Sequence, residues 1–188
     1  FHSSPVNILS SSNTLNKVTI RQVWAHNVFE EMQLLRSLID TYNYIAIDTE
    51  FPGVVHRPAV SCRTNNEFQY ASIKSNADVL KLIQLGVCLC DANGNIMPDY
   101  CCWQFNFRFD CTVDEYAADS FKLLVKSGIN FDLLSNYGIP WQLFGELLLT
   151  SGVVLNPAVH WLSFHSSYDF AYLARAFTNA PLPPTFQA

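Results

Sequence analysis

Two acidic residues two positions apart, Asp48 and Glu50, end an apolar run that begins at Tyr44. The run predicts a β-strand, in which residues i and i+2 project from the same face. Pro52 and Gly53 interrupt the strand directly afterwards, so both carboxylates should emerge at its C-terminal end. Two like charges beside a core are unfavourable unless a cation lies between them. The spacing therefore predicts a divalent-metal site at the end of this strand.

A third acid, Asp169, follows a predicted strand at 160–164 and falls in the first turn of a predicted helix at 167–177. If this strand and the strand at 44–50 are parallel neighbours, their carboxyl ends meet, where ligands of open α/β sheets bind. Three carboxylates from separate elements suit Mg²⁺ or Mn²⁺. Two such ions serve phosphodiester cleavage, because one activates the attacking water and the other neutralises charge on the leaving oxygen.

Each of these residues also has a plainer interpretation. An Asp-x-Glu pair at a strand end is often only solvated, and the spacing of Ser166 and Asp169 matches a helix capping box. His165 suits a supporting imidazole at the edge of the core better than a catalytic base. Phe51 is either a core residue or a surface on which a base stacks. The residues alone leave these alternatives open.

The other elements are predicted from the spacing of apolar residues. Asn27 followed by Glu30 predicts a capped helix start, and Asn93-Gly94 predicts a hairpin turn. The order suits a sheet with helices on both faces, antiparallel at the hairpin and parallel elsewhere. The expected helices are at about 27–39, 66–80, 114–127, 140–151 and 167–177, and the expected strands at 44–50, 81–91, 103–109 and 160–164.

The strand at 103–109 alternates aromatic and polar residues with a period of two. Its aromatic residues should therefore share one buried face, while the residues between them should point outward. The aromatic set is Trp103, Phe105, Phe107 and Phe109, and the polar set is Gln104, Asn106 and Arg108.

Composition limits the class of protein. A chain of 188 residues with 49% hydrophobic and 14% charged residues suits one globular domain, which we place at 18–188 after a flexible Ser/Asn-rich tail at 1–17. No apolar run is long enough to span a membrane. The net charge of −5 argues against a broad basic face, although it does not exclude RNA. Six cysteines without a C-x-x-C pair fit a reduced, intracellular protein.

Several segments, in order and with compatible spacing, resemble the Caf/Pop deadenylase family. Its members are the poly(A)-shortening exonuclease subunits of the Ccr–Not complex, within the DEDD superfamily. The matching segments are Asp-Thr-Glu-Phe-Pro-Gly-Val-Val at 48–55, Ile-Gln-Leu-Gly at 83–86, Trp-Gln-Phe-Asn-Phe at 103–107, Ser-Gly-Val-Val at 151–154, Trp-Leu-Ser-Phe-His-Ser at 161–166 and Tyr-Asp-Phe at 168–170.

The resemblance implies an RNase H-like mixed sheet with helices on both faces and a catalytic, metal-binding role for Asp48, Glu50 and Asp169. Phe51 and His165 are the candidates for substrate contact. The implied reaction is hydrolysis of the 3′-terminal phosphodiester of a poly(A) tail with Mg²⁺ or Mn²⁺, releasing 5′-AMP. The implied partners are RNA with a 3′ poly(A) end, a scaffold subunit of the Ccr–Not complex and a second deadenylase. The expected locations are the cytoplasm and the nucleus.

The sequence also departs from the family. The fourth acid of the DEDD set lies on a later helix in relatives, and no Asp or Glu follows Asp169 here. We therefore expect a domain truncated at its C-terminus, with an incomplete site for the second metal. The loop from Arg57 to Arg63 departs as well. Two alternatives stay open: a catalytically impaired RNase H-like module that links a scaffold to another nuclease, and a DEDD nuclease for another substrate.

Overall fold

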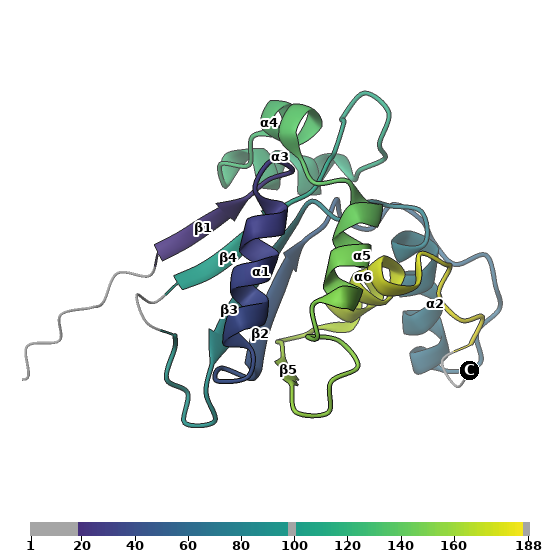
Figure 1. Ribbon diagram of the computed structural model, residues 1–188. Helices are drawn as coiled ribbons and strands as arrows, with labels where there is room; N and C mark the ends of the chain where they lie inside the picture. The colour runs from purple at the N-terminus through teal and green to yellow at the C-terminus, as the bar shows by residue number, and fades with distance from the viewer. Residues whose placement is uncertain (1–18, 98–100, 186–188) are drawn as a thin grey trace, which may run out of the picture.

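The computed structural model describes residues 19–97 and 101–185, which form a mixed sheet packed against six helices (Figure 1). The sheet order is β1-β4-β3-β2-β5. The predicted tail at 1–17 lies outside the described residues. No helix within the described residues is long and apolar enough to cross a bilayer.

The three central strands form an antiparallel meander, and one parallel strand joins each side of it. This arrangement confirms the expected hairpin. The strand that carries Asp48 and Glu50 also pairs in parallel with the strand that precedes Asp169, as expected. The sheet also has an edge strand, β1, that the sequence pattern did not predict. The strands are β1 Thr19–Val23, β2 Tyr44–Glu50, β3 Gln84–Cys90, β4 Cys101–Asn106 and β5 His160–Leu162.

The helices lie in three groups around the sheet (Figure 1). α1 and α5 pack on one face of the central strands, α2 and α6 pack together beside β2 and β5, and α3 and α4 cross the ends of β1 and β4. Gly145 of α5 touches α6 so closely that a Cβ there would collide with the carbonyl oxygen of Ala176. The helices are α1 Val28–Leu38, α2 Asn65–Ala77, α3 Ala118–Lys126, α4 Phe131–Tyr137, α5 Trp141–Thr150 and α6 Ser167–Thr178.

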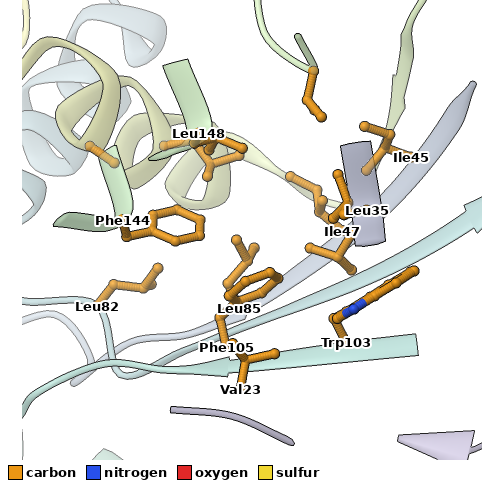
Figure 2. Close-up of a cluster of buried hydrophobic side chains, with 14 of the residues drawn as sticks. Val23, Leu35, Ile45, Ile47, Leu82, Leu85, Trp103, Phe105, Phe144 and Leu148 are labelled. Carbon is orange, nitrogen blue, oxygen red and sulfur yellow. The ribbon is translucent and has the colours of Figure 1, made fainter. Parts of the chain in front are cut away.

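The main core fills the space between α1, α5 and the sheet (Figure 2). Alternate residues of each central strand point into it, as a half-buried strand requires. Trp103 is 1% exposed, and its indole N–H donates to Glu31 Oε2 at 3.0 Å. Glu31 in turn binds Arg21 of the edge strand through both carboxylate oxygens, at 2.6 and 2.8 Å. A polar chain from the partly exposed Arg21 to the buried Trp103 therefore fixes β1 to the sheet.

The aromatic alternation is correct for the first part of the predicted strand and wrong beyond it. Trp103, Phe105 and Phe107 enter the main core, but β4 ends at Asn106, and Phe109 packs in a separate cluster beneath α3 and α4. Asn106, expected to point outward, is 1% exposed because its carboxamide bonds several neighbouring groups. A period of two cannot reveal such a polar network.

Two predicted helix starts need correction. α1 begins after Asn27, but the Asn27 side chain accepts the N–H of Trp24 at 2.7 Å and does not cap the helix. The helix predicted from 114 begins at Ala118, because Asp114 accepts the N–H of Asp110 at 2.8 Å and holds a turn there. The short helix α4 was absent from the sequence prediction.

Candidate active site

The end of β2 separates its side chains onto two faces. Asp48 and Glu50 are exposed on one face, while Thr49 is buried on the other, which also carries Ile45 and Ile47. β2 pairs in parallel with β5 from Tyr44 to Ala46, so both strands run toward the end that carries the acids. The predicted exit of two carboxylates at a strand end is thus the geometry observed.

Asp169 reaches this end of the sheet from α6. It is 6% exposed, and its Oδ1 accepts a hydrogen bond from Thr49 Oγ1 at 2.7 Å. The N-cap residue of α6, Ser166, makes no side-chain capping hydrogen bond. The capping-box interpretation of the segment is therefore wrong, and the first turn of α6 is joined to the residue between the two β2 acids.

The three carboxylates share one electrostatic environment. Partial burial raises the pKa of Glu50, and the negative charges of Asp48 and then Asp169 raise it further. Both effects disfavour the ionised form of Glu50. A bound cation would reverse them, because it favours ionised ligands.

The described part of the chain contains no group of three His, Cys, Asp or Glu side chains already placed to hold a metal. The donor chemistry nevertheless suits a hard cation, since carboxylate oxygens are the usual ligands of Mg²⁺ and Mn²⁺. Asp48 and Glu50 are accessible from one face, whereas one oxygen of Asp169 is engaged by Thr49. The assignment of these three residues as metal ligands stays a prediction.

Phe51 and His165, the candidates for substrate contact, lie in different surroundings. Phe51 is half-buried and stacks on Tyr168 with ring centroids 4.9 Å apart, and it tilts against Tyr172 at 5.6 Å. His165 is exposed in the β5–α6 loop with φ of 52°, and its ring meets the edge of Phe164. Phe51 therefore supports the site from the core side, and its role in stacking a base stays untested.

The turn after the acids has no room for a side chain. Gly53 has φ of 89°, and a Cβ there would collide with Ser120 and Ala117 of the segment that begins α3. The N–H of Ala117 also donates to the carbonyl of Pro52 at 2.8 Å. The chain leaving Glu50 is consequently held against α3, which limits its freedom next to the acids.

A polar cavity of about 340 Å³ lies beside Glu50, and the sequence prediction missed it. Its wall is a network of carboxamides centred on Asn106, which accepts from Gln84 at 2.7 Å and donates to Gln22 at 3.0 Å. Gln84 is the cross-strand partner of Glu50. Carboxamides present both donors and acceptors, as the edge of a nucleobase requires. The sequence signal for this cavity is the set of amide side chains at Gln84, Gln104 and Asn106. They can be recognised as neighbours only when the strand register is known.

Comparison with known proteins decides the family. The family model described as CAF1 family ribonuclease matches residues 23–143. This chain belongs to the CAF1 ribonuclease family. The CAF1 match covers the strand with the first two acids, the hairpin and the start of α5, and it includes most of the residues that line the cavity beside Glu50.

Curated relatives agree. The chain is 47% identical over 176 residues to a probable CCR4-associated factor 1 homolog 7 of Arabidopsis thaliana, covering 90% of this chain and 64% of the relative. It is 46% identical over 168 residues to the poly(A) ribonuclease pop2 of Schizosaccharomyces pombe, covering 89% of this chain and 50% of the relative. The chain thus spans between half and two thirds of the length of these relatives.

Solved structures of the family share the fold. The S. pombe Pop2p structure, in a form with Mg²⁺ and Mn²⁺ bound, matches with a TM-score of 0.87 at 46% identity, over 89% of this chain and 67% of that one. A CAF1 co-crystallized with the yeast NOT1 MIF4G domain matches with a TM-score of 0.77 at 34% identity, over 90% of this chain and 62% of that one. The mixed α/β fold expected from the sequence is therefore the fold of Pop2 ribonucleases.

Proposed function

We propose that this chain carries the acids of a metal-dependent 3′→5′ exoribonuclease that shortens poly(A) tails and releases 5′-AMP. The observation that carries the proposal is that Asp169 is hydrogen-bonded to Thr49, the residue between Asp48 and Glu50, in a CAF1-family fold. A relative of this family is named a poly(A) ribonuclease. Its structural counterpart binds Mg²⁺ and Mn²⁺.

Asp48 and Glu50 would hold the cation from the open face, and Asp169 would approach from α6. The bound ions would supply an activated water and neutralise charge on the leaving oxygen. Thr49 keeps Asp169 turned toward the strand end, because its hydroxyl donates to one carboxylate oxygen. The raised pKa of Glu50 makes metal binding pH-dependent, since a proton must leave before the carboxylate can act as a ligand.

The partners and the location are part of the same proposal. A CAF1 that shares this fold was co-crystallized with a NOT1 MIF4G domain, so we infer that this chain also binds the scaffold of a Ccr–Not complex. A second deadenylase would join through that assembly. We place the protein in the cytoplasm and the nucleus, where messenger RNA tails are found.

The direct test follows a 5′-labelled RNA that ends in adenosines, in Mg²⁺ or Mn²⁺, with Asp48→Ala as the inactive control. Shortening by single nucleotides that is lost in Asp48→Ala would support the proposal. Activity that requires the C-terminal segment of the longer relatives would place the remaining metal ligand there. A parallel reaction on tails of other bases and on DNA separates a deadenylase from a nuclease of broader substrate range.

One observation favours a second function, a non-catalytic module that links a scaffold to another nuclease. Among the described residues no three side chains are already placed as a metal site, and Asp169 is partly engaged by Thr49. Thermal unfolding with and without Mn²⁺ separates the two functions. Mn²⁺ at a hundredfold over its Kd should stabilise the enzyme by about 2.7 kcal/mol. No response to Mn²⁺, together with no tail shortening, would favour the linking module.

A further inference from the structure

The cavity beside Glu50 is polar but carries no positive charge. Among the described residues, Glu50 is the only ionisable side chain that lines it, and the others are amides, a hydroxyl, a few apolar residues and Trp24. At about 340 Å³ the cavity is within the size range of sites that bind small ligands. A phosphate would find no cationic partner here, whereas a neutral ring with donors and acceptors on its edge would find amides to bind. The wall therefore suits a nucleobase better than an anion.

Asn106 fixes the orientation of the amides in this wall. Its side chain is 1% exposed, and its Nδ2 donates to two backbone carbonyls, those of Val23 and Gln104, both at 3.1 Å. A carbonyl oxygen can only accept, so the Asn106 amide cannot be turned over without losing both bonds. Its Oδ1 is therefore the atom that accepts from side chains, and it accepts from Gln84 Nε2 at 2.7 Å.

The fixed amide of Asn106 leaves defined groups free on its two neighbours. Gln84 uses an N–H toward Asn106, and its Oε1 accepts no hydrogen bond from a described residue and is not buried. Gln22 is oriented in the opposite sense, because its Oε1 accepts from Asn106 Nδ2 at 3.0 Å and its own N–H groups donate to no described residue. Gln22 is exposed and Gln84 is half-buried, so a ligand can reach both. The wall presents a free acceptor on Gln84 and free donors on Gln22.

The free acceptor of Gln84 lies next to the candidate metal ligands. Gln84 is the cross-strand partner of Glu50, and directly opposite residues of an antiparallel pair have Cβ atoms about 4.5–5.5 Å apart. In the proposed exonuclease reaction, the released 3′-terminal nucleotide keeps the phosphate of the cleaved bond. Its base stays attached to that phosphate before and after cleavage, so a base site beside Glu50 would hold substrate and product alike.

We propose that the cavity beside Glu50 holds the base of the 3′-terminal nucleotide and selects adenine. This role rests on the proposed exonuclease function and specifies its substrate. The exocyclic amine of adenine donates to Gln84 Oε1, and a ring nitrogen accepts from Gln22 Nε2. A purine with a carbonyl in place of the amine would set two acceptor oxygens against each other. Gln84 cannot turn its amide over to relieve that contact without losing its bond to Asn106.

Isothermal titration calorimetry in Mg²⁺ with two mononucleotides tests this role. 5′-AMP and 5′-IMP share the ribose and the phosphate and differ at the purine edge, where IMP has a carbonyl in place of the amine. The parent protein should bind 5′-AMP at least about fivefold more tightly than 5′-IMP, the value of one good base-edge contact. Gln84→Leu and Gln22→Leu should each bring the two affinities closer together. Gln33→Leu, at an exposed position of α1, should leave their ratio unchanged.

Three results would overturn the base site: no binding of 5′-AMP, equal binding of 5′-AMP and 5′-IMP by the parent protein, or an unchanged ratio in both variants. Gln22 is exposed, so its variant keeps the test decisive if Gln84→Leu does not fold. Mononucleotide binding needs no turnover, which separates this site from the exonuclease activity. Trimming of labelled RNA without a preference for 5′-AMP would reject only the role of the cavity. A preference for 5′-AMP without trimming would reject only the exonuclease.

Discussion

Thr49 and Asp169 are joined by a 2.7 Å hydrogen bond between residues 120 positions apart in the chain. Thr49 lies between the two acids of β2, and Asp169 lies in the first turn of α6. The bond fixes the spacing between the strand that carries two acids and the helix that carries the third. A hydroxyl on the buried face of β2 therefore positions the third candidate acid relative to the two acids exposed on the other face.

Thr49→Val should lower both stability and tail shortening. The substitution keeps the shape of the side chain but leaves the buried Asp169 carboxylate without its partner, which costs about 1–3 kcal/mol. Urea unfolding measures the first effect and the RNA assay the second. Thr49→Ser should retain most of both, and Thr41→Val, on an exposed threonine, is the matched control. Full activity in Thr49→Val would remove the positioning role.

Glu50→Gln should raise the free energy of unfolding at neutral pH. The pKa of Glu50 is raised in the folded protein, so the ionised carboxylate opposes folding above that pKa, and the penalty disappears as pH falls below the ordinary carboxyl range. The gain should be less than about 1 kcal/mol, because the side chain is solvent-exposed. Unfolding curves at pH 7 and at about pH 4 measure it.

The sign of this effect is the decisive point. Glu146→Gln, on an exposed carboxylate of α5, serves as the comparison. A Glu50→Gln protein that is less stable than the parent at pH 7, or whose gain grows on acidification, would contradict the repulsion between the three acids. Added Mn²⁺ should stabilise the parent protein more than the variant.

Trp103→Ala should destabilise the fold by about 3–5 kcal/mol, the usual range for a buried aromatic residue. The ring fills the core between α1 and the sheet, and its loss also removes a donor from Glu31 (Figure 2). Trp103→Phe should cost less, because an aromatic ring still fills most of the core space, and Glu31 keeps both bonds to Arg21. Thermal unfolding of the three proteins gives the order, and a Trp103→Ala protein as stable as the parent would disprove the packing.

Gln84→Leu should reduce the preference for adenosine over uridine tails. Gln84 lies opposite Glu50 in the sheet and contributes a carboxamide to the cavity beside it. Loss of a good base-edge contact is worth about 1 kcal/mol or more, roughly a fivefold change in discrimination. Competing reactions on the two tails measure the ratio. Gln69→Leu, on the exposed side of α2, should leave it unchanged, and an equal loss of rate on both tails would deny base selection by Gln84.

Local patterns predicted the elements better than the contacts between them. The apolar run at 44–50 and the Asn-Gly turn identified β2 and the hairpin, because apolar runs and turn chemistry are local properties. The parallel pairing of β2 with β5, which the sequence suggested as the condition for Asp169 to approach the first two acids, is observed. β1 escaped detection because its five residues alternate weakly and depend on Arg21 binding Glu31.

The polar contacts of the site could not be predicted from the sequence. Thr49 looked like any strand residue of the buried face, and only the tertiary fold brings Asp169 to it. Asn106 was expected outside because alternation says nothing of side-chain hydrogen bonds. Polar networks require the register of elements that are distant in the sequence.

The position of Asp169 on α6 also depends on Gly145, a residue of the neighbouring helix α5. With no side chain, this residue lets α5 rest directly on the backbone of α6 near Ala176, two turns beyond the acid. Any larger residue would collide with the backbone of α6, and α6 would have to shift relative to α5. The carboxylate at its start would then move relative to Asp48 and Glu50. A methyl group placed in the middle of α5 is thus enough to misalign acids that it never touches.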